Sequence, residues 1–159
     1  MAVRKIRIAL IEDSPTVRFS YKLLFEKAGF EVFEADNAKD GWDLICEKKP
    51  DVIVLDMIMP KIPGIELLKR IRSVEFSKDI PVLVLTSLKE EDKVKEIFQS
   101  GADHYCLKGM DSPEVIRETI YKLLKEKEQK RVKQLLEGQK PKEEEKPPDP
   151  GLDRFFWYF

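Results

Sequence analysis

Five short apolar runs recur along the chain at intervals that suit an alternation of strands and helices. They cover residues 6–11, 32–35, 52–55, 82–85 and 104–107. The first, third and fourth runs are nearly continuous rather than alternating between apolar and polar positions, and strands covered on both faces have this pattern. The fifth run is weaker but lies where a last strand is expected. The pattern predicts a parallel sheet with helices on both faces.

The segments between the runs read as helices with clear start and stop residues. Ser14 and Pro15 supply an N-cap and a first-turn proline for the first helix, and Gly29 ends it. The other helices are expected to begin at Asn37, after Gly64, near Glu90 and at Ser112. Strand and helix alternate five times, which predicts one doubly wound α/β domain with a five-stranded parallel sheet and right-handed crossovers.

The last predicted helix is longer than such a domain needs. Its apolar positions that can pack on the sheet are Ile116, Ile120, Leu123 and Leu124. Residues 125–131 are almost wholly charged or polar, and apolar residues return at Val132, Leu135 and Leu136. This pattern fits either a solvated helical extension or a short coiled-coil or partner-docking helix, through which two copies would be able to pair.

The composition changes again after this helix. Residues 138–151 are rich in proline, lysine and glutamate, cannot bury a core, and read as an extended flexible linker. Residues 152–159 form an aromatic C-terminal peptide, expected to dock on a partner, to fold back or to join two copies, because aromatic anchors dominate binding energy. Its aromatic residues are Phe155, Phe156, Trp157, Tyr158 and Phe159. Ahead of these segments lie a folded domain over residues 1–125 and a helical extension over 126–137.

Composition narrows the class of protein. A chain of 159 residues can bury one core but hardly two, and its net charge of −1 gives no electrostatic reason to expect binding to nucleic acid or anionic lipid. Cys46 and Cys106 are expected to be buried, reduced thiols. Because no signal peptide or run of ~20 apolar residues is found, the chain is expected in the cytoplasm. Asn37 is the only asparagine and Lys and Glu are abundant, a composition that favours a thermophilic source.

Polar side chains follow four of the predicted strands. In an open parallel sheet, ligands gather at the carboxyl ends of the strands, so these side chains are expected to face one pocket. Three of them are carboxylates, whose mutual repulsion a divalent cation relieves, and an all-oxygen site suits Mg²⁺ or Mn²⁺ rather than zinc. The residues are Glu12 and Asp13 after the first strand, Asp56 after the third, Thr86 and Ser87 after the fourth, and Lys108 after the fifth.

The cluster also suits phosphoryl transfer. Asp56 ends the central strand and is the natural nucleophile toward phosphorus, forming an acyl phosphate. Asp13 would hold the metal with help from Glu12, while the Lys108 ammonium and the Thr86 hydroxyl would neutralise phosphoryl oxygens. Each residue alone is more often a helix cap or a solvated side chain. The ordered set on successive strand ends is far harder to obtain by accident.

Four motifs in this set resemble the receiver domain of bacterial two-component response regulators, over about residues 5–125. The resemblance implies a flavodoxin-like receiver fold and a stand-alone, chemotaxis-type regulator with an added tail. It also implies phosphoryl transfer to an aspartate from a histidine kinase or a phosphotransfer protein. The motifs are LIEDS at residues 10–14, VLDMIMP at 54–60 with Gly64 following, VLTS at 84–87 and GADHYCLK at 101–108.

The resemblance assigns roles to particular residues. It implies that Asp56 is the phosphoacceptor and that Mg²⁺ is bound by Asp13, Asp56, the backbone carbonyl of Ile58 and, through water, Glu12. Phosphoryl contacts from Thr86 and Lys108 are also implied. The family usually has proline after this lysine, often with a cis bond, whereas Lys108 precedes Gly109 here.

Two further features of the family concern switching and phosphoryl lifetime. Tyr105 matches the switch aromatic, which turns inward when the threonine moves toward phosphate and so alters the surface of the fourth helix, fifth strand and fifth helix. Ile58 and Leu88 match the positions that set how long the phosphoryl group lasts. Both are apolar, so autodephosphorylation is expected to be slow.

Two other classes of function compete with a phosphorylated switch. The first is a receiver-like interaction or scaffold module that is never phosphorylated, and the intact acidic set argues against it. The second is a Mg²⁺-dependent phosphohydrolase with an aspartyl nucleophile. Such enzymes commonly have a second aspartate two residues after the nucleophile, where this chain has Ile58. No enzymatic or DNA-binding output domain is expected.

Overall fold

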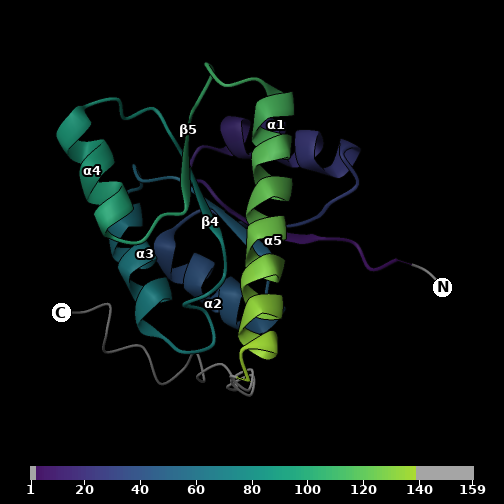
Figure 1. The fold of residues 1–159 in the computed structure, drawn as a ribbon. Coiled ribbons are helices and arrows are strands. Elements are labelled where there is room, and N and C mark those ends of the chain that lie inside the picture. The colour runs from purple at the N-terminus through teal and green to yellow at the C-terminus, as the bar shows by residue number, and fades with distance from the viewer. Residues whose placement is uncertain (1–2, 139–159) are drawn as a thin grey trace.

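The computed structural model describes residues 3–138. Five parallel strands form one sheet in the order β2-β1-β3-β4-β5. Figure 1 shows the ribbon, with β4 and β5 between α4 and α5 in this view. The strands are β1 (Arg7–Ile11), β2 (Glu31–Ala35), β3 (Val52–Leu55), β4 (Val82–Thr86) and β5 (His104–Leu107). The helices are α1 (Pro15–Lys27), α2 (Ala38–Lys48), α3 (Gly64–Ser73), α4 (Glu91–Gln99) and α5 (Pro113–Leu136). The predicted doubly wound α/β fold is confirmed, and each strand lies within one residue of its expected bounds.

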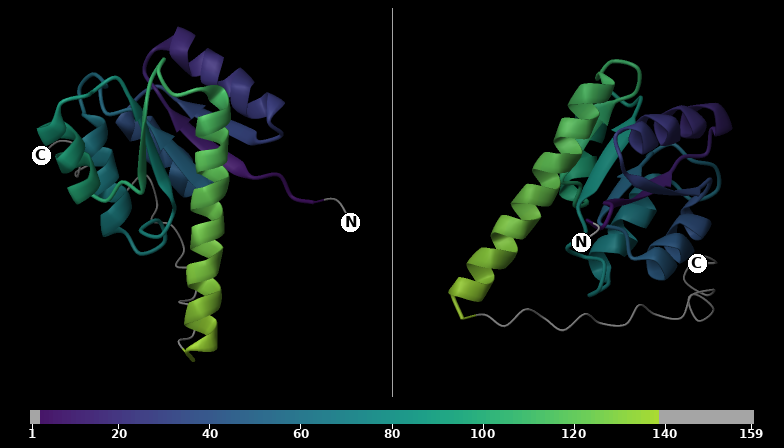
Figure 2. Two further views of the ribbon diagram at one scale, coloured as in Figure 1. Left: turned by 45° about the horizontal axis from the view of Figure 1, so that its top comes forward. Right: turned by 90° about the vertical axis from the view of Figure 1, so that its right-hand side faces the viewer.

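Alternate residues of the inner strands point to opposite faces of the sheet, which explains the continuous apolar runs. On one face, Ile8 and Leu10 of β1 share a core with α1 and α5. On the other face, Ala9 and Ile11 share a second core with α2, α3 and α4, in which Trp42 is fully buried. The two views of Figure 2 show α1 and α5 on one side of the sheet. Both faces of β1, β3 and β4 are therefore shielded from solvent.

Three helices begin at the caps that the sequence predicts. The side chains of Ser14, Asn37 and Ser112 each accept a hydrogen bond from a backbone N–H of the first turn, which satisfies one donor left free at a helix start. Ser14 fixes the start of α1 directly after β1. The short connection between β1 and α1 matters for the site, because it holds in place the two acidic residues that follow β1.

Helix α5 continues well beyond the sheet. Its buried residues all lie in its first half and end at Leu123, whereas residues 125–138 are exposed. Figure 2 shows the second half of the helix projecting past the other elements. The predicted linker, from residue 139 onward, and the aromatic peptide lie outside the described residues.

Both cysteines are buried free thiols, as predicted. Burial raises the pKa of Cys106 to about 11, so this thiol stays protonated at neutral pH and is a poor nucleophile and metal ligand. Within residues 3–138, no helix combines the length and apolar character needed to cross a membrane.

Candidate functional site

The three predicted carboxylates converge at the carboxyl ends of β1 and β3. These strands are neighbours, Ile11 pairs with Leu55 in the register, and the backbone N–H of Asp56 donates to the carbonyl of Ile11 at 3.0 Å. Carboxylate oxygens of Glu12, Asp13 and Asp56 consequently lie within 4.8 Å of one another. Glu12 and Asp56 are each only 3% exposed. The expected approach of these three carboxylates at the strand ends is thus present in the structure.

Lys108 reaches this cluster from β5. Its Nζ lies 2.8 Å from Oδ2 of Asp56 and forms a second ion pair with Oε2 of Glu12. Burial alone would lower the pKa of Lys108, but its hydrogen bonds to Asp56 and Glu12 outweigh that effect and raise the pKa above its ordinary value. The ammonium therefore stays charged at neutral pH. The Lys108–Gly109 peptide is trans, like every other peptide bond of residues 3–138, and Gly109 takes a positive φ of 73°.

The charges of the site fit a divalent cation. Three carboxylates and one ammonium leave two negative charges in a small, largely buried volume. Burial raises the pKa of Glu12 above its ordinary value, and the negative charge of Asp56 raises it further, while the hydrogen bond from Lys108 opposes both. Oxygen donors of this kind suit Mg²⁺, which would lower the repulsion between the carboxylates.

The loop after Asp56 is held by a close approach of two backbones. The N–H of Gly64 donates to the carbonyl of Met57 at 3.0 Å, at the start of α3. A Cβ atom at Gly64 would lie 2.0 Å from the carbonyl oxygen of Asp56, so any other residue would push this loop away. Ile58 lies in the same loop, and its N–H donates to Oδ1 of Asp56 at 3.2 Å. The backbone that would supply the Ile58 carbonyl ligand is thus tied to the Asp56 side chain.

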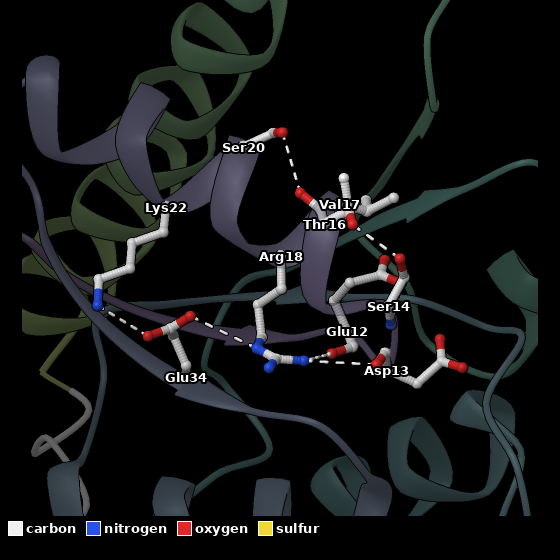
Figure 3. Close-up of polar contacts among 9 residues, drawn as sticks. All are labelled: Glu12, Asp13, Ser14, Thr16, Val17, Arg18, Ser20, Lys22 and Glu34. Atoms are coloured by element: carbon white, nitrogen blue, oxygen red, sulfur yellow. Dashed lines mark hydrogen bonds and ion pairs between the residues drawn. The ribbon is translucent and has the colours of Figure 1, made fainter.

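Arg18 is a site residue that the sequence analysis missed. From the first turns of α1, its Nη1 donates to the backbone carbonyls of Glu12, at 2.8 Å, and of Asp13, at 3.4 Å (Figure 3). Its Nε lies 3.4 Å from Glu34 on β2, which also pairs with Lys22 at 2.8 Å. The guanidinium fixes the direction of the peptide units that carry the acidic pair. Its position one turn into a helix after an acidic pair was only a weak sequence signal, because a solvated arginine can occupy the same position.

The predicted switch residues Thr86 and Tyr105 lie on β4 and β5, the two strands that follow β3 in the sheet. Thr86, at the end of β4, is fully buried, its carbonyl accepts the N–H of Lys108 at 3.0 Å, and its Oγ1 accepts the N–H of Leu88 at 3.5 Å. The hydroxyl of Tyr105 donates to the carbonyl of Leu88, and its ring packs against the core under α2, α3 and α4. Tyr105 is therefore half-buried in this structure and is bonded to the loop that follows Thr86.

The two predicted tuning residues differ in their surroundings. Ile58 is 51% exposed, whereas Leu88 is partly buried against the same core as Tyr105. Ser87, between Thr86 and Leu88, is exposed. The aromatic residues 155–159 lie outside the described part of the chain.

The sequence profile of the response regulator receiver domain matches residues 8–121, which include every residue of this site. The chain belongs to this receiver family. Receiver domains of response regulators work in two-component signalling by phosphorylation. They use Mg²⁺ at an acidic pocket, and they interact with histidine kinases or phosphotransfer proteins and with downstream targets. The predicted resemblance is confirmed.

Relatives of this receiver domain differ in length. This chain is 31% identical over 118 residues to sporulation initiation phosphotransferase F of Bacillus subtilis strain 168. The aligned region covers 74% of this chain and 93% of that protein. The chain is 35% identical over 109 residues to the phosphate regulon transcriptional regulatory protein PhoB of Pseudomonas aeruginosa, covering 69% of this chain and 48% of that protein. The chain thus spans about half the length of the first transcriptional regulators that it matches.

Solved structures include receiver domains of similar size. Chemotaxis protein CheY4 of Vibrio cholerae matches with a TM-score of 0.71 at 26% identity, over 76% of this chain and 99% of that one. The receiver domain of the Francisella response regulator 1452 matches with a TM-score of 0.70 at 29% identity, over 77% of this chain and 98% of that one.

Proposed function

We propose that this chain is a stand-alone response regulator that accepts one phosphoryl group on Asp56 from a histidine kinase or a phosphotransfer protein. The observation that carries the proposal is a buried Asp56 carboxylate held between the Lys108 ammonium and two further carboxylates. The stand-alone form is supported by the sporulation phosphotransferase and CheY4, nearly all of whose length is matched. In this role the chain signals by binding other proteins when phosphorylated.

The chemical step is a displacement at phosphorus. An oxygen of Asp56 attacks the phosphorus of a phosphohistidine, the P–O bond forms as the P–N bond breaks, and the imidazole leaves with the electron pair and takes up a proton. Asp13, Asp56, the Ile58 carbonyl and, through water, Glu12 would hold Mg²⁺, which neutralises charge on the phosphoryl oxygens. Mn²⁺ would suit the same oxygen donors.

The ammonium group of Lys108 and the hydroxyl of Thr86 complete the site. Lys108 is already bonded to Asp56, so its ammonium stands where negative charge on the transferred group develops. Thr86 is linked to Lys108 through its carbonyl, and movement of its hydroxyl toward the phosphoryl group would pull on the loop that carries Leu88. Because Tyr105 is bonded to that loop, the surface of α4, β5 and α5 would respond.

Uptake of phosphorus from a small donor tests this function without knowledge of the kinase. The full chain is incubated with acetyl phosphate in Mg²⁺, in Mn²⁺ and in EDTA, and its intact mass is measured. We expect one added phosphoryl group with either metal, and none in EDTA. An unchanged mass in all three conditions, with no response to beryllofluoride, would instead indicate an interaction module that is never phosphorylated.

The apolar residues Ile58 and Leu88 are expected to make the phosphoryl group long-lived. Neither side chain can hydrogen-bond an attacking water, and an acyl phosphate hydrolyses only as fast as water is positioned. The double variant Ile58→Asn, Leu88→Glu should raise the rate of autodephosphorylation on the order of tenfold, less than the ~100-fold that a well-placed general base provides. The decay of the phosphorylated mass over time measures it. Equal rates in both proteins would refute the proposed shielding.

The aromatic peptide at 152–159 is proposed as a second docking element for a protein partner. This peptide contains five adjacent aromatic residues, and aromatic residues contribute a large share of the binding energy in protein interfaces. Deleting residues 152–159 should remove at least part of partner capture in a pull-down while leaving phosphoryl uptake unchanged. Partner capture equal to that of the full chain would dismiss a docking role.

A further inference from the structure

Five residues of α5 form a line of side chains that we call the α5 seam: Tyr121, Lys125, Glu128, Val132 and Leu135. They are spaced by four and three residues in turn, which is the repeat of a coiled-coil contact line. The three apolar members remain exposed by 46%, 44% and 47%. Tyr121 also packs its ring against Phe30 of its own domain, with the ring centroids 5.3 Å apart. Val132 and Leu135 lie beyond the last buried residue of α5, so in a monomer their exposed side chains remain in contact with water.

The seam lies on the side of α5 away from its own sheet. The residues of this helix that are buried include Ile116, Ile120 and Leu123. At 3.6 residues per turn, the seam falls roughly opposite to them around the helix. The second half of α5 also projects past the domain, so a second helix can lie along the seam without meeting the sheet (Figure 2). A shallow hollow at this place is lined by Lys125, Val132 and Leu136, among others.

The charges of Lys125 and Glu128 distinguish a parallel from an antiparallel pair of two copies. In a parallel pair of two copies, each seam residue faces itself, so Lys125 would face Lys125 and Glu128 would face Glu128, both repulsive. In an antiparallel pair, each copy's Lys125 faces the partner's Glu128, and two attractive contacts replace two repulsive ones. Glu128 lies 3.9 Å from Arg131 on its own helix, an exposed contact too weak to prevent this.

We propose that a second copy of this chain occupies the α5 seam in antiparallel orientation, with the two-fold axis passing between Glu126 and Lys127. In this register Tyr121 faces the partner's Val132, whereas Leu135 lies opposite the partner's Glu118 near the end of the contact. The contact extends over residues 117–136, which is the part of α5 that remains symmetric about the axis. The heptad spacing, the contact of Tyr121 with Val132 and the charges of Lys125 and Glu128 thus favour this one arrangement.

This arrangement leaves both phosphorylation sites open. Helix α5 begins at Pro113, shortly after Lys108, so its N-terminal end lies near the acidic cluster. In an antiparallel pair the two N-terminal ends point away from each other. Each Asp56 therefore remains accessible to its own phosphodonor, and the pair presents two switch surfaces at opposite ends.

Charge exchange across the seam tests the proposal on the full chain. Sedimentation velocity over a dilution series should show a concentration-dependent dimer of the wild type. Lys125→Glu and Glu128→Lys should each raise the dissociation constant by about tenfold, because two attractive contacts become repulsive. The double variant, and an equal mixture of the two single variants, should restore wild-type association. Lys130→Glu, which changes the same charge off the seam, should have no effect.

Other outcomes overturn the antiparallel seam. A wild-type chain that stays monomeric at all concentrations removes the dimer altogether. Association that the single exchanges leave unchanged, or that the double variant does not restore, assigns the dimer to a parallel pair or to the aromatic peptide. None of these variants touches the acidic cluster, so phosphoryl uptake is expected to be normal in all of them, and failure of the dimer leaves the proposed function intact.

Discussion

Asp56→Asn should abolish phosphoryl uptake while the protein remains folded. The amide has the shape of the carboxylate, but its oxygen is a far weaker nucleophile and cannot form a stable acyl phosphate. It can still accept the hydrogen bond that the N–H of Ile58 now donates to Asp56, and Lys108 keeps its ion pair with Glu12. Intact mass after incubation with acetyl phosphate and Mg²⁺ should therefore show no gain, whereas the melting temperature should stay near that of the wild type.

A matched control separates this loss from a general effect of removing a carboxylate. Asp79 lies on the surface ahead of β4 and away from the cluster, and Asp79→Asn should take up phosphorus like the wild type. Asp13→Asn should slow uptake by weakening the metal site but should not move the phosphoryl group to another residue. A mass gain that persists in Asp56→Asn would assign the acceptor elsewhere and remove the basis of the proposed function.

Much of this site was predictable because it depends on strand ends. In a parallel sheet all carboxyl ends lie at one edge, so Glu12, Asp13, Asp56 and Lys108 were expected at the same edge once the strands were assigned. Assignment itself was straightforward, since the inner strands are apolar on both faces. Three helix starts, at Ser14 and at two other capping residues, depend on local hydrogen bonds. They could therefore be predicted from the sequence as readily as the strands.

Some contacts could not be predicted from the sequence. They join different elements, and whether those elements meet depends on the order and register of the strands. Arg18 looks like an ordinary basic residue of a solvated helix face, and only the fold shows that its guanidinium turns back onto the carbonyls of the acidic pair. Likewise, Gly64 reads as a helix start, whereas its approach to the Asp56 backbone requires three-dimensional placement. The bonding of Tyr105 to the loop after β4 also depends on the packing of a neighbouring strand.

Arg72 is the clearest example of such a hidden contact, and it joins three segments at the edge of the sheet where β4 and β5 begin, opposite the edge with the acidic site. From the last turn of α3, Nη1 donates to the carbonyls of Lys78 and Ile80 at 3.0 and 2.8 Å, and Nε donates to Gly101 at 2.8 Å. Its Nη2 pairs with Asp103 at 2.7 Å. Asp103 in turn accepts the N–H of Val82 at 2.8 Å.

Arg72→Met should therefore be strongly destabilising. Methionine retains much of the aliphatic packing, but it leaves three carbonyls without their donor and a carboxylate without its counter-charge. Removing one partner from such a network costs about 3 kcal/mol, a large part of the ~5–15 kcal/mol that holds a domain folded. For a chain of this length the melting temperature should fall by roughly 6–12 °C.

Lys69→Met on the same helix is the matched control, because it removes the same kind of charge from the surface. Lys69 pairs with Glu66 at 3.4 Å, with both side chains about half exposed, and such pairs contribute at most about 1 kcal/mol. Urea unfolding of the two variants should thus separate them by about 2 kcal/mol or more. If Arg72→Met cost no more than Lys69→Met, the end of α3 and the starts of β4 and β5 would be held together by apolar packing and would not depend on the hydrogen bonds and ion pair of Arg72.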